Sequence, residues 1–224
     1  MKNIFILIVL FLVFSCEKEN KSKLIAPKMV HDSSVISTNK EVKLSNEEIL
    51  KIQKEEEKER SQIVRKYTLS QKGNGFEYKV FCEEEKSGMI NFTKVNILKL
   101  GKLFQQLKID KDSTLVFHDY EVDFSCNEDW NFDGYNDFKL INRVGMVDQS
   151  YYLWLYDEKS RKYKLSPSFS KIINPVANKK NKEITSSYHA GPVTYYYFTY
   201  KFENGKFVQT KAEVEGEDYL IILL

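Results

Sequence analysis

The alternation of apolar and polar residues from about residue 67 onward constrains the fold of this chain more than any other feature. In residues 76–82 every second side chain is Phe, Tyr, Val or Cys. This period of two is typical of a strand with one buried face. Turn sequences separate such segments; Asn204-Gly205 is a strong two-residue hairpin signal. We predict strands at residues 76–82, 90–100, 114–117, 122–124, 138–142, 151–156, 162–165, 183–188, 193–202 and 206–213, with 103–107 either a strand or a short helix.

Composition agrees with a β-rich domain. Aromatic residues make up 14% of the chain, and they favour strands. No clean internal repeat of the kind that a full propeller needs is visible. We therefore predict an all-β domain over residues 67–224, an antiparallel β-sandwich, with a propeller-like arrangement as the alternative. The formal net charge of +2 gives no electrostatic case for binding nucleic acid.

A helix is predicted at residues 45–66, before the strands. Ser45 is a suitable N-cap, and Glu48 stands at the capping-box position three residues later. The apolar stripe of this segment is thin, which indicates an exposed or loosely docked helix. Residues 16–44 are polar and without periodicity, so we interpret them as a flexible tether.

The first 15 residues have the organisation of a secretory signal peptide. Lys2 precedes a short apolar stretch that ends before Cys16. About ten apolar residues are too few to span a bilayer, which needs about twenty. Residues 13–16, Val-Phe-Ser-Cys, resemble the lipobox of bacterial lipoproteins. That resemblance implies lipidation of Cys16, attachment to a membrane through the lipid, and a location in the bacterial cell envelope, at the outer membrane and periplasmic or surface-facing. Plain secretion with an incidental cysteine is the alternative.

The loop at residues 129–137 reads D-W-N-F-D-G-Y-N-D. Ca²⁺ takes six to eight oxygen ligands, and alternate residues of a short loop supply them. Gly134 suits the sharp bend that such a loop requires. We predict Ca²⁺ ligation by the side chains of Asp129, Asn131, Asp133 and Asp137 and by the backbone carbonyl of Tyr135.

This loop differs from the helical EF-hand. Position 12 is Leu140 where an EF-hand has a bidentate Glu, and both flanks have strand character. We therefore predict that the loop joins two strands and that its calcium is structural, neither sensory nor catalytic. A turn rich in Asp, Asn and Gly without metal is the alternative.

The cysteines leave two alternatives open. If Cys16 is lipidated, Cys82 and Cys126 form an even pair in an oxidising compartment. They form either a disulfide or two buried thiols, because the sequence gives no distance between them. The scattered His31, His118 and His189 provide no zinc-ligand spacing.

An ordered set of segments resembles a known family. It comprises the D-x-N-x-D-G-x-x-D loop, residues 151–157 (YYLWLYD), residues 184–187 (ITSS), a turn with Gly191, residues 195–197 (YYY) and residues 200–206 (YKFENGK). The order is similar to that of calcium-binding periplasmic lipoproteins related to i-type lysozyme inhibitors. Some members of that group are immunity proteins against secreted peptidoglycan hydrolases. The resemblance covers about residues 124–214.

The resemblance implies a β-scaffold that inserts a loop into the active-site cleft of a lysozyme-like peptidoglycan hydrolase. The family loop carries a Ser-Gly-x-x-Tyr element. Here it corresponds to residues 187–195, where Ala190 replaces the Ser and the Tyr comes one residue late. The contact residues implied are Ser187, Tyr188, His189, Gly191 and Tyr195. Ordinary strand packing of the tyrosines is the alternative for each of them.

Three classes of function compete. The first is an inhibitor or immunity protein for a lysozyme-like hydrolase, and the second is a non-enzymatic, calcium-stabilised envelope module that binds a glycan or another protein. The third is an enzyme, which we do not expect. The acidic run at residues 83–85 is a charged turn, no Ser/His/Asp order stands out, and the carboxylates of the loop are committed to the ion.

Overall fold

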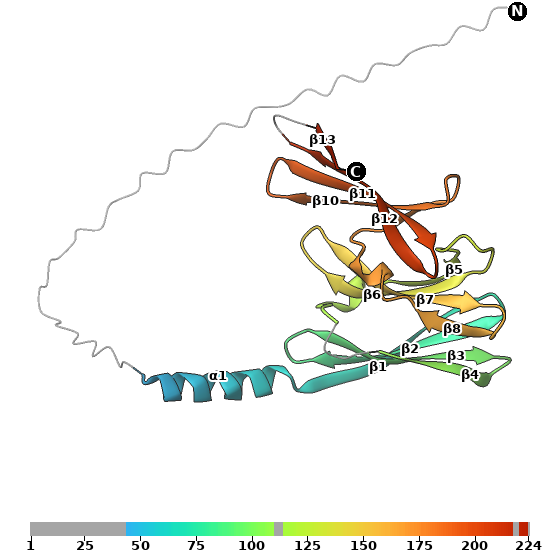
Figure 1. Cartoon of the computed structure of the whole chain (residues 1–224). Helices are drawn as coiled ribbons and strands as arrows, with labels where there is room; N and C mark the ends of the chain where they lie inside the picture. Colours follow the sequence, from blue (N-terminus) through green and yellow to red (C-terminus); the bar gives the residue numbers. More distant parts are fainter. Residues whose placement is uncertain (1–43, 110–113, 217–219, 224) are drawn as a thin grey trace, which may run out of the picture. The chain divides into compact units, whose positions relative to one another are not determined.

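The computed structural model describes residues 44–109, 114–216 and 220–223 (Figure 1). The predicted signal peptide, Cys16 and all but the last residue of the predicted tether lie outside this part. None of the helices in the described ranges is both long enough and apolar enough to cross a membrane.

The N-terminal helix α1 spans Asn46–Arg60. The predicted capping box is present: the amide N–H of Glu48 donates to Ser45 Oγ at 3.3 Å, and the amide N–H of Ser45 donates to Glu48 Oε2 at 2.9 Å. No residue of α1 is buried. The helix stops six residues earlier than predicted because the β-branched Ile63 and Val64 already belong to strand β1, which pairs with β2.

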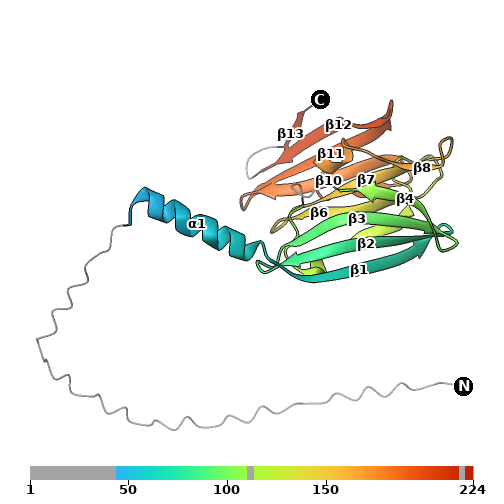
Figure 2. The same cartoon turned by 90° about the horizontal axis from the view of Figure 1, so that it is seen from below.

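The strands form three antiparallel sheets, and within each sheet every strand pairs with its neighbour in the sequence. The four-stranded first sheet, whose strands lie side by side in Figure 2, contains β1 (Ile63–Gly73), β2 (Phe76–Glu85), β3 (Ile90–Lys99) and β4 (Lys102–Lys108). The second sheet contains β5 (Phe124–Glu128), β6 (Asp137–Val144), β7 (Gln149–Asp157) and β8 (Lys162–Leu165). The five-stranded third sheet contains β9 (Val176–Asn178), β10 (Glu183–Ala190), β11 (Thr194–Glu203), β12 (Lys206–Glu215) and β13 (Leu220–Leu223).

The prediction of an all-β, sandwich-like fold is confirmed. Residues 103–107 belong to a strand, β4, and the Asn204-Gly205 turn joins β11 to β12 as expected. The strand predicted at residues 114–117 is wrong. That segment makes a single bridge, in which Leu115 pairs with Arg143 in parallel orientation.

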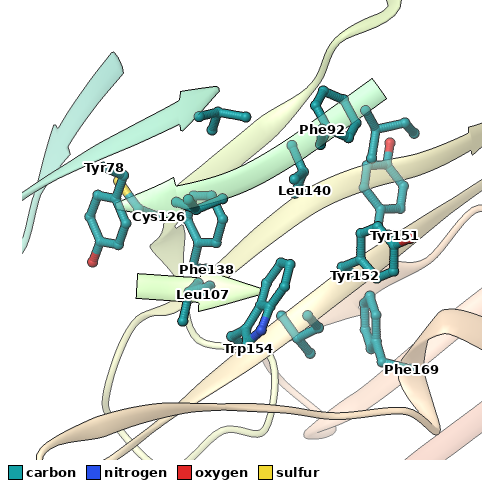
Figure 3. Close-up of a cluster of buried hydrophobic side chains, with 14 of the residues drawn as sticks. Tyr78, Phe92, Leu107, Cys126, Phe138, Leu140, Tyr151, Tyr152, Trp154 and Phe169 are labelled. Carbon is teal, nitrogen blue, oxygen red and sulfur yellow. The ribbon is translucent and has the colours of Figure 1, made fainter. Parts of the chain in front are cut away.

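The main core lies between the first and second sheets (Figure 3). Tyr78 of β2 stacks on Phe138 of β6 with ring centroids 5.1 Å apart and an interplanar angle of 3°. The hydroxyl groups of Tyr78 and Tyr163 form a buried hydrogen bond of 2.6 Å. This bond gives the otherwise apolar interface a fixed polar contact, because a buried hydroxyl needs a partner.

The third sheet joins the core through the short 3₁₀ helix η3 (Phe169–Lys171). The Phe169 ring meets Trp130 and Phe207 edge-on, each with centroids 5.1 Å apart. Next to it, Ser168 Oγ accepts the amide N–H of Phe207 at 2.9 Å. Phe169 therefore links the loop after β5 to strand β12.

Candidate functional site

The acidic loop at residues 129–137 joins β5 to β6, so the predicted strand–loop–strand arrangement is confirmed. Its first carboxylate organises the bend: Asp129 accepts the amide N–H of Gly134 at 2.8 Å and that of Asp133 at 3.2 Å. Gly134 has φ of +95°, a conformation that a side chain makes costly. The loop thus turns where the sequence predicted that it would.

The middle of the loop is tied by its own polar groups. Asn131 Nδ2 donates to Asp133 Oδ2 at 2.8 Å, and Asp133 Oδ1 accepts the amide N–H of Tyr135 at 2.9 Å. These bonds are characteristic of Asp/Asn turns. They place the oxygens of Asp129, Asn131 and Asp133 on the same short turn.

Asp137, the last predicted ligand, is 1% exposed. Its Oδ2 accepts the amide N–H of Trp130 at 2.8 Å, and its Oδ1 accepts that of Tyr156 at 3.0 Å. Burial raises the pKa of this carboxyl to about 7; the two amide donors oppose the rise, whereas the charges of Asp133 and Asp129 add to it. The Asp137 carboxyl group is therefore the buried end of the loop, and its pKa depends on the charges of Asp129 and Asp133.

Metal ligation is not preformed in the loop. In the described part of the chain, no three His, Cys, Asp or Glu side chains are grouped so as to hold a metal ion. The carboxylates accept hydrogen bonds from loop amides and, at Asp137 Oδ1, from the amide of Tyr156 in β7. The donor set itself consists of oxygen atoms only, which suits Ca²⁺, and the repulsion on Asp137 is of the sign that a cation would relieve. Calcium binding stays a prediction.

Lys139 is a notable neighbour of the loop that the sequence reasoning missed. Its Nζ lies 4.8 Å from the centre of the Trp130 ring and 4.4 Å from that of Tyr151. Glu128 and Asp123 carboxylates lie 3.7 and 3.9 Å from it. The ammonium group is thus held by two aromatic faces and two acids. The only indication in the sequence that Lys139 lies near the loop was its position two residues after Asp137.

The segment predicted to contact a partner is the β10–β11 hairpin. Ala190 pairs with Thr194, and residues 191–193 form the turn. Gly191 takes φ of +73°, and His189 Nδ1 lies 3.0 Å from its carbonyl oxygen. Because a carbonyl oxygen only accepts, Nδ1 carries the proton. The His189 side chain therefore braces the turn.

The five predicted contact residues do not share one face of the hairpin. Tyr188 stacks on Tyr196 with centroids 5.1 Å apart, on the face that also carries Ile184 and other core residues. His189 and Tyr195 form a register pair on the opposite face, with rings 5.7 Å apart. Tyr195 is 43% exposed. The exposed face therefore presents His189 and Tyr195, with Ser187 further from the tip, and Tyr188 packs within the sheet.

Cys82 and Cys126 are free and buried, so the disulfide alternative is wrong. In the β1–β2 register Cys82 lies opposite Tyr67, whereas Cys126 Sγ lies beside Gly73, 2.6 Å from where a Cβ on that glycine would be. The strand from Tyr67 to Gly73 is about 20 Å long, and bonded cysteines need Cα atoms within about 7 Å. Burial raises the pKa of the Cys82 thiol to about 12 and that of Cys126 to about 11.

The acidic run at residues 83–85 lies at the end of strand β2, not on a turn as predicted, and takes part in surface ion pairs. Lys66 Nζ lies 2.7 Å from Glu83, and Arg65 Nε lies 2.5 Å from Glu84. Across a strand pair such charges stabilise the sheet modestly. Their geometry gives a structural account of the run.

Together these features define an antiparallel all-β protein with an acidic inter-strand loop and an exposed aromatic hairpin. No protein-family model and no curated protein sequence matches this chain. One solved structure that is similar to it is described as "Structure of a Xanthomonas Type IV Secretion System related protein". It has 19% identity and a TM-score of 0.46, and the match covers 73% of this chain and 90% of that one. A likeness at this level carries no argument about function.

Proposed function

We propose that this protein is an envelope lipoprotein that inhibits a lysozyme-like peptidoglycan hydrolase by inserting the tip of the β10–β11 hairpin into the enzyme's cleft. The observation that carries the proposal is the exposed pair of His189 and Tyr195 beside the Gly191 turn. A projecting two-stranded tip with polar aromatic groups has the shape and the chemistry to enter a concave site.

The chemistry of the target supports this choice. Glycoside hydrolases act with a pair of carboxyl groups that flank the scissile bond. The Tyr195 hydroxyl is a hydrogen-bond donor for a carboxylate, and His189 donates through Nε2 when its ring carries both protons. The internal contact of Nδ1 with Gly191 keeps the imidazole oriented before binding, which lowers the entropy cost of association.

Structural calcium is the second part of the proposal. Asp129, Asn131, Asp133 and Asp137 would supply side-chain oxygens and Tyr135 its carbonyl, after the carboxylates exchange their amide contacts for the ion. The loop also carries Trp130, which contacts η3 through Phe169. Calcium would thus brace the connection between the second and third sheets. Lipidation of Cys16 and the envelope location complete the proposal.

The test is inhibition of purified hydrolases by the chain from residue 17 onward. We expect slower cleavage of peptidoglycan by at least one member of a panel of lysozymes and other peptidoglycan hydrolases. His189→Ala and Tyr195→Ala should each raise the inhibition constant about tenfold, the size of effect that one contact at the centre of an interface has.

The matched control is Tyr120→Ala, since Tyr120 is an exposed tyrosine outside the hairpin. Its inhibition constant should equal that of the unmodified protein. Absence of inhibition and of complex formation across the panel would refute the proposal, as would equal inhibition by the hairpin variants and the control.

A further inference from the structure

Two hollows in the protein surface share one wall. One has a volume of about 360 Å³ and the other of about 570 Å³, and Tyr135 and Tyr156 line both of them. Sites for small ligands have volumes of roughly 300–1,000 Å³. The two tyrosines therefore stand between adjacent spaces, each of which is large enough for one unit of a chain-like ligand.

The smaller hollow has an aromatic side. The Tyr156 ring lies 5.1 Å from that of Tyr163, 6.4 Å from that of Phe76 and 5.8 Å from that of Tyr135. The buried hydrogen bond to Tyr78 holds the Tyr163 ring in place, so the ring cluster is fixed before a ligand binds. Rigid aromatic faces suit the C–H-bearing face of a pyranose ring or a methyl group, at a low cost in entropy.

The same hollow has an amide side. Asn136 Nδ2 donates to Asn74 Oδ1 at 2.8 Å, and Asn74 Nδ2 donates to the carbonyl oxygen of Cys126 at 2.7 Å. The Asn74 amide also bonds to the Tyr78 hydroxyl, whereas Asn136 keeps a second N–H hydrogen and its carbonyl oxygen as an acceptor. Asn74 thus orients the Asn136 amide, which still has one donor and one acceptor for a ligand.

The charges of the larger hollow argue against an anionic ligand. Lys99 is the cation on the wall of the smaller hollow. The larger one has Asp157 and Glu158 among its lining residues, besides the proposed calcium ligand Asp133, and these acids are opposed by two lysines. A phosphate or a nucleotide would meet these carboxylates at close range. A neutral, polyhydroxylated ligand gains hydrogen bonds from both signs of charge.

We propose that these hollows bind a glycan chain through an acetamido sugar. An acetamido group combines one N–H and one C=O, which match the Asn136 amide, with a methyl group, which matches the neighbouring Phe76 ring. A sugar with a hydroxyl in that position leaves part of the Asn136 amide without a partner, and that mismatch is the source of discrimination. The next unit of the chain passes over Tyr135 and Tyr156 into the larger hollow.

This site is separate from the hairpin tip. The larger hollow includes Phe202 and Gly205, at the end of β11 that is remote from Thr194. A strand of this length, Thr194–Glu203, extends about 33 Å. The glycan site and the proposed inhibitory tip can therefore be tested by different substitutions.

The experiment is calorimetric titration of the chain from residue 17 onward, in calcium, with chitotetraose and with cellotetraose. The two probes have the same linkage and differ by acetamido groups. We expect chitotetraose to bind at least fivefold more tightly. Tyr135→Ala and Asn136→Ala should each weaken its binding about fivefold or more. Tyr120→Ala is the matched control and should leave binding unchanged.

Melting temperatures show whether each variant is folded. If Tyr135→Ala is not folded, Lys99→Ala, at an exposed position, replaces it as the test variant. No binding of chitotetraose, equal affinity for the two probes, or equal binding by the variants and the control each overturns the glycan proposal. Asn136→Ala should leave hydrolase inhibition intact, whereas Tyr195→Ala should leave chitotetraose binding intact. Failure of one proposal is therefore distinguishable from failure of the other.

Discussion

The buried carboxyl of Asp137 makes the stability of this domain depend on pH in an unusual direction. Its pKa in the fold is about 7, against an ordinary value of 3.8. Between these values the unfolded chain has released the proton and the folded chain retains it. Because the folded state then binds more protons, its stability falls as pH rises. The full difference is on the order of 4 kcal/mol, at 1.36 kcal/mol for each unit of pKa.

In a chelator, we expect the free energy of unfolding to decrease by about 2–3 kcal/mol between pH 5 and pH 8 because of this one group. Carboxyl groups with a lowered pKa affect stability at lower pH: Asp157, whose pKa is about 2, loses its contribution to folding stability only below pH 4. The measurement is urea unfolding followed by the fluorescence of the buried Trp130 and Trp154.

Asp137→Asn should remove the pH dependence between pH 5 and pH 8, although the variant is less stable at every pH because an amide has one acceptor oxygen for two backbone donors. Glu203→Gln, an exposed position, is the control and should keep the dependence. If calcium binds, added calcium should flatten the profile of the unmodified protein. A flat profile in chelator, or a slope that survives in Asp137→Asn, would refute this account of the buried carboxyl.

Four further outcomes are expected. Asp133→Ala should lower the melting temperature in calcium and change it little in chelator; equal melting of both proteins in calcium would rule out a metal site. Phe138→Ala, at the contact between the second and first sheets, should lower the free energy of urea unfolding by about 3–5 kcal/mol; a loss below 1 kcal/mol would contradict the packing of that ring. Lys139→Met should cost about 1 kcal/mol through lost cation–π contacts, as measured in the same assay; no loss would show that the rings do not stabilise the ammonium group. Cys82 and Cys126 should resist iodoacetamide in the native protein and both react after unfolding without reductant, as read by mass spectrometry; a protected pair in the unfolded chain would reveal a disulfide.

The sequence predicted the local structure well where one physical signal dominated. Alternation located most strands, because a strand with one buried face must repeat every two residues. Ser45 and Glu48 located the start of α1, and Gly134 located the bend of the acidic loop. Each of these features depends on interactions within a few residues.

Features that depend on distant partners were not predictable in this way. The end of α1 was missed because strand pairing of Ile63 competes with helix propensity, and propensity alone does not include that pairing. The separation of Cys82 from Cys126 follows from register and from the place of β5 beside Gly73. Alternation along β10 puts Tyr188 and His189 on opposite faces, but which face is exposed depends on how the third sheet packs against the core.

The pairing of every strand with its sequence neighbour has a consequence for folding. Each sheet is built from one continuous stretch of chain, so closing its strand pairs costs little loop entropy. Chains with such local pairing fold faster than sandwiches whose strands cross between sheets. The first sheet can therefore assemble while later segments of the chain are still being synthesised. We therefore expect the Tyr78–Phe138 contact, which joins two sheets, to form after the strand pairs within each sheet.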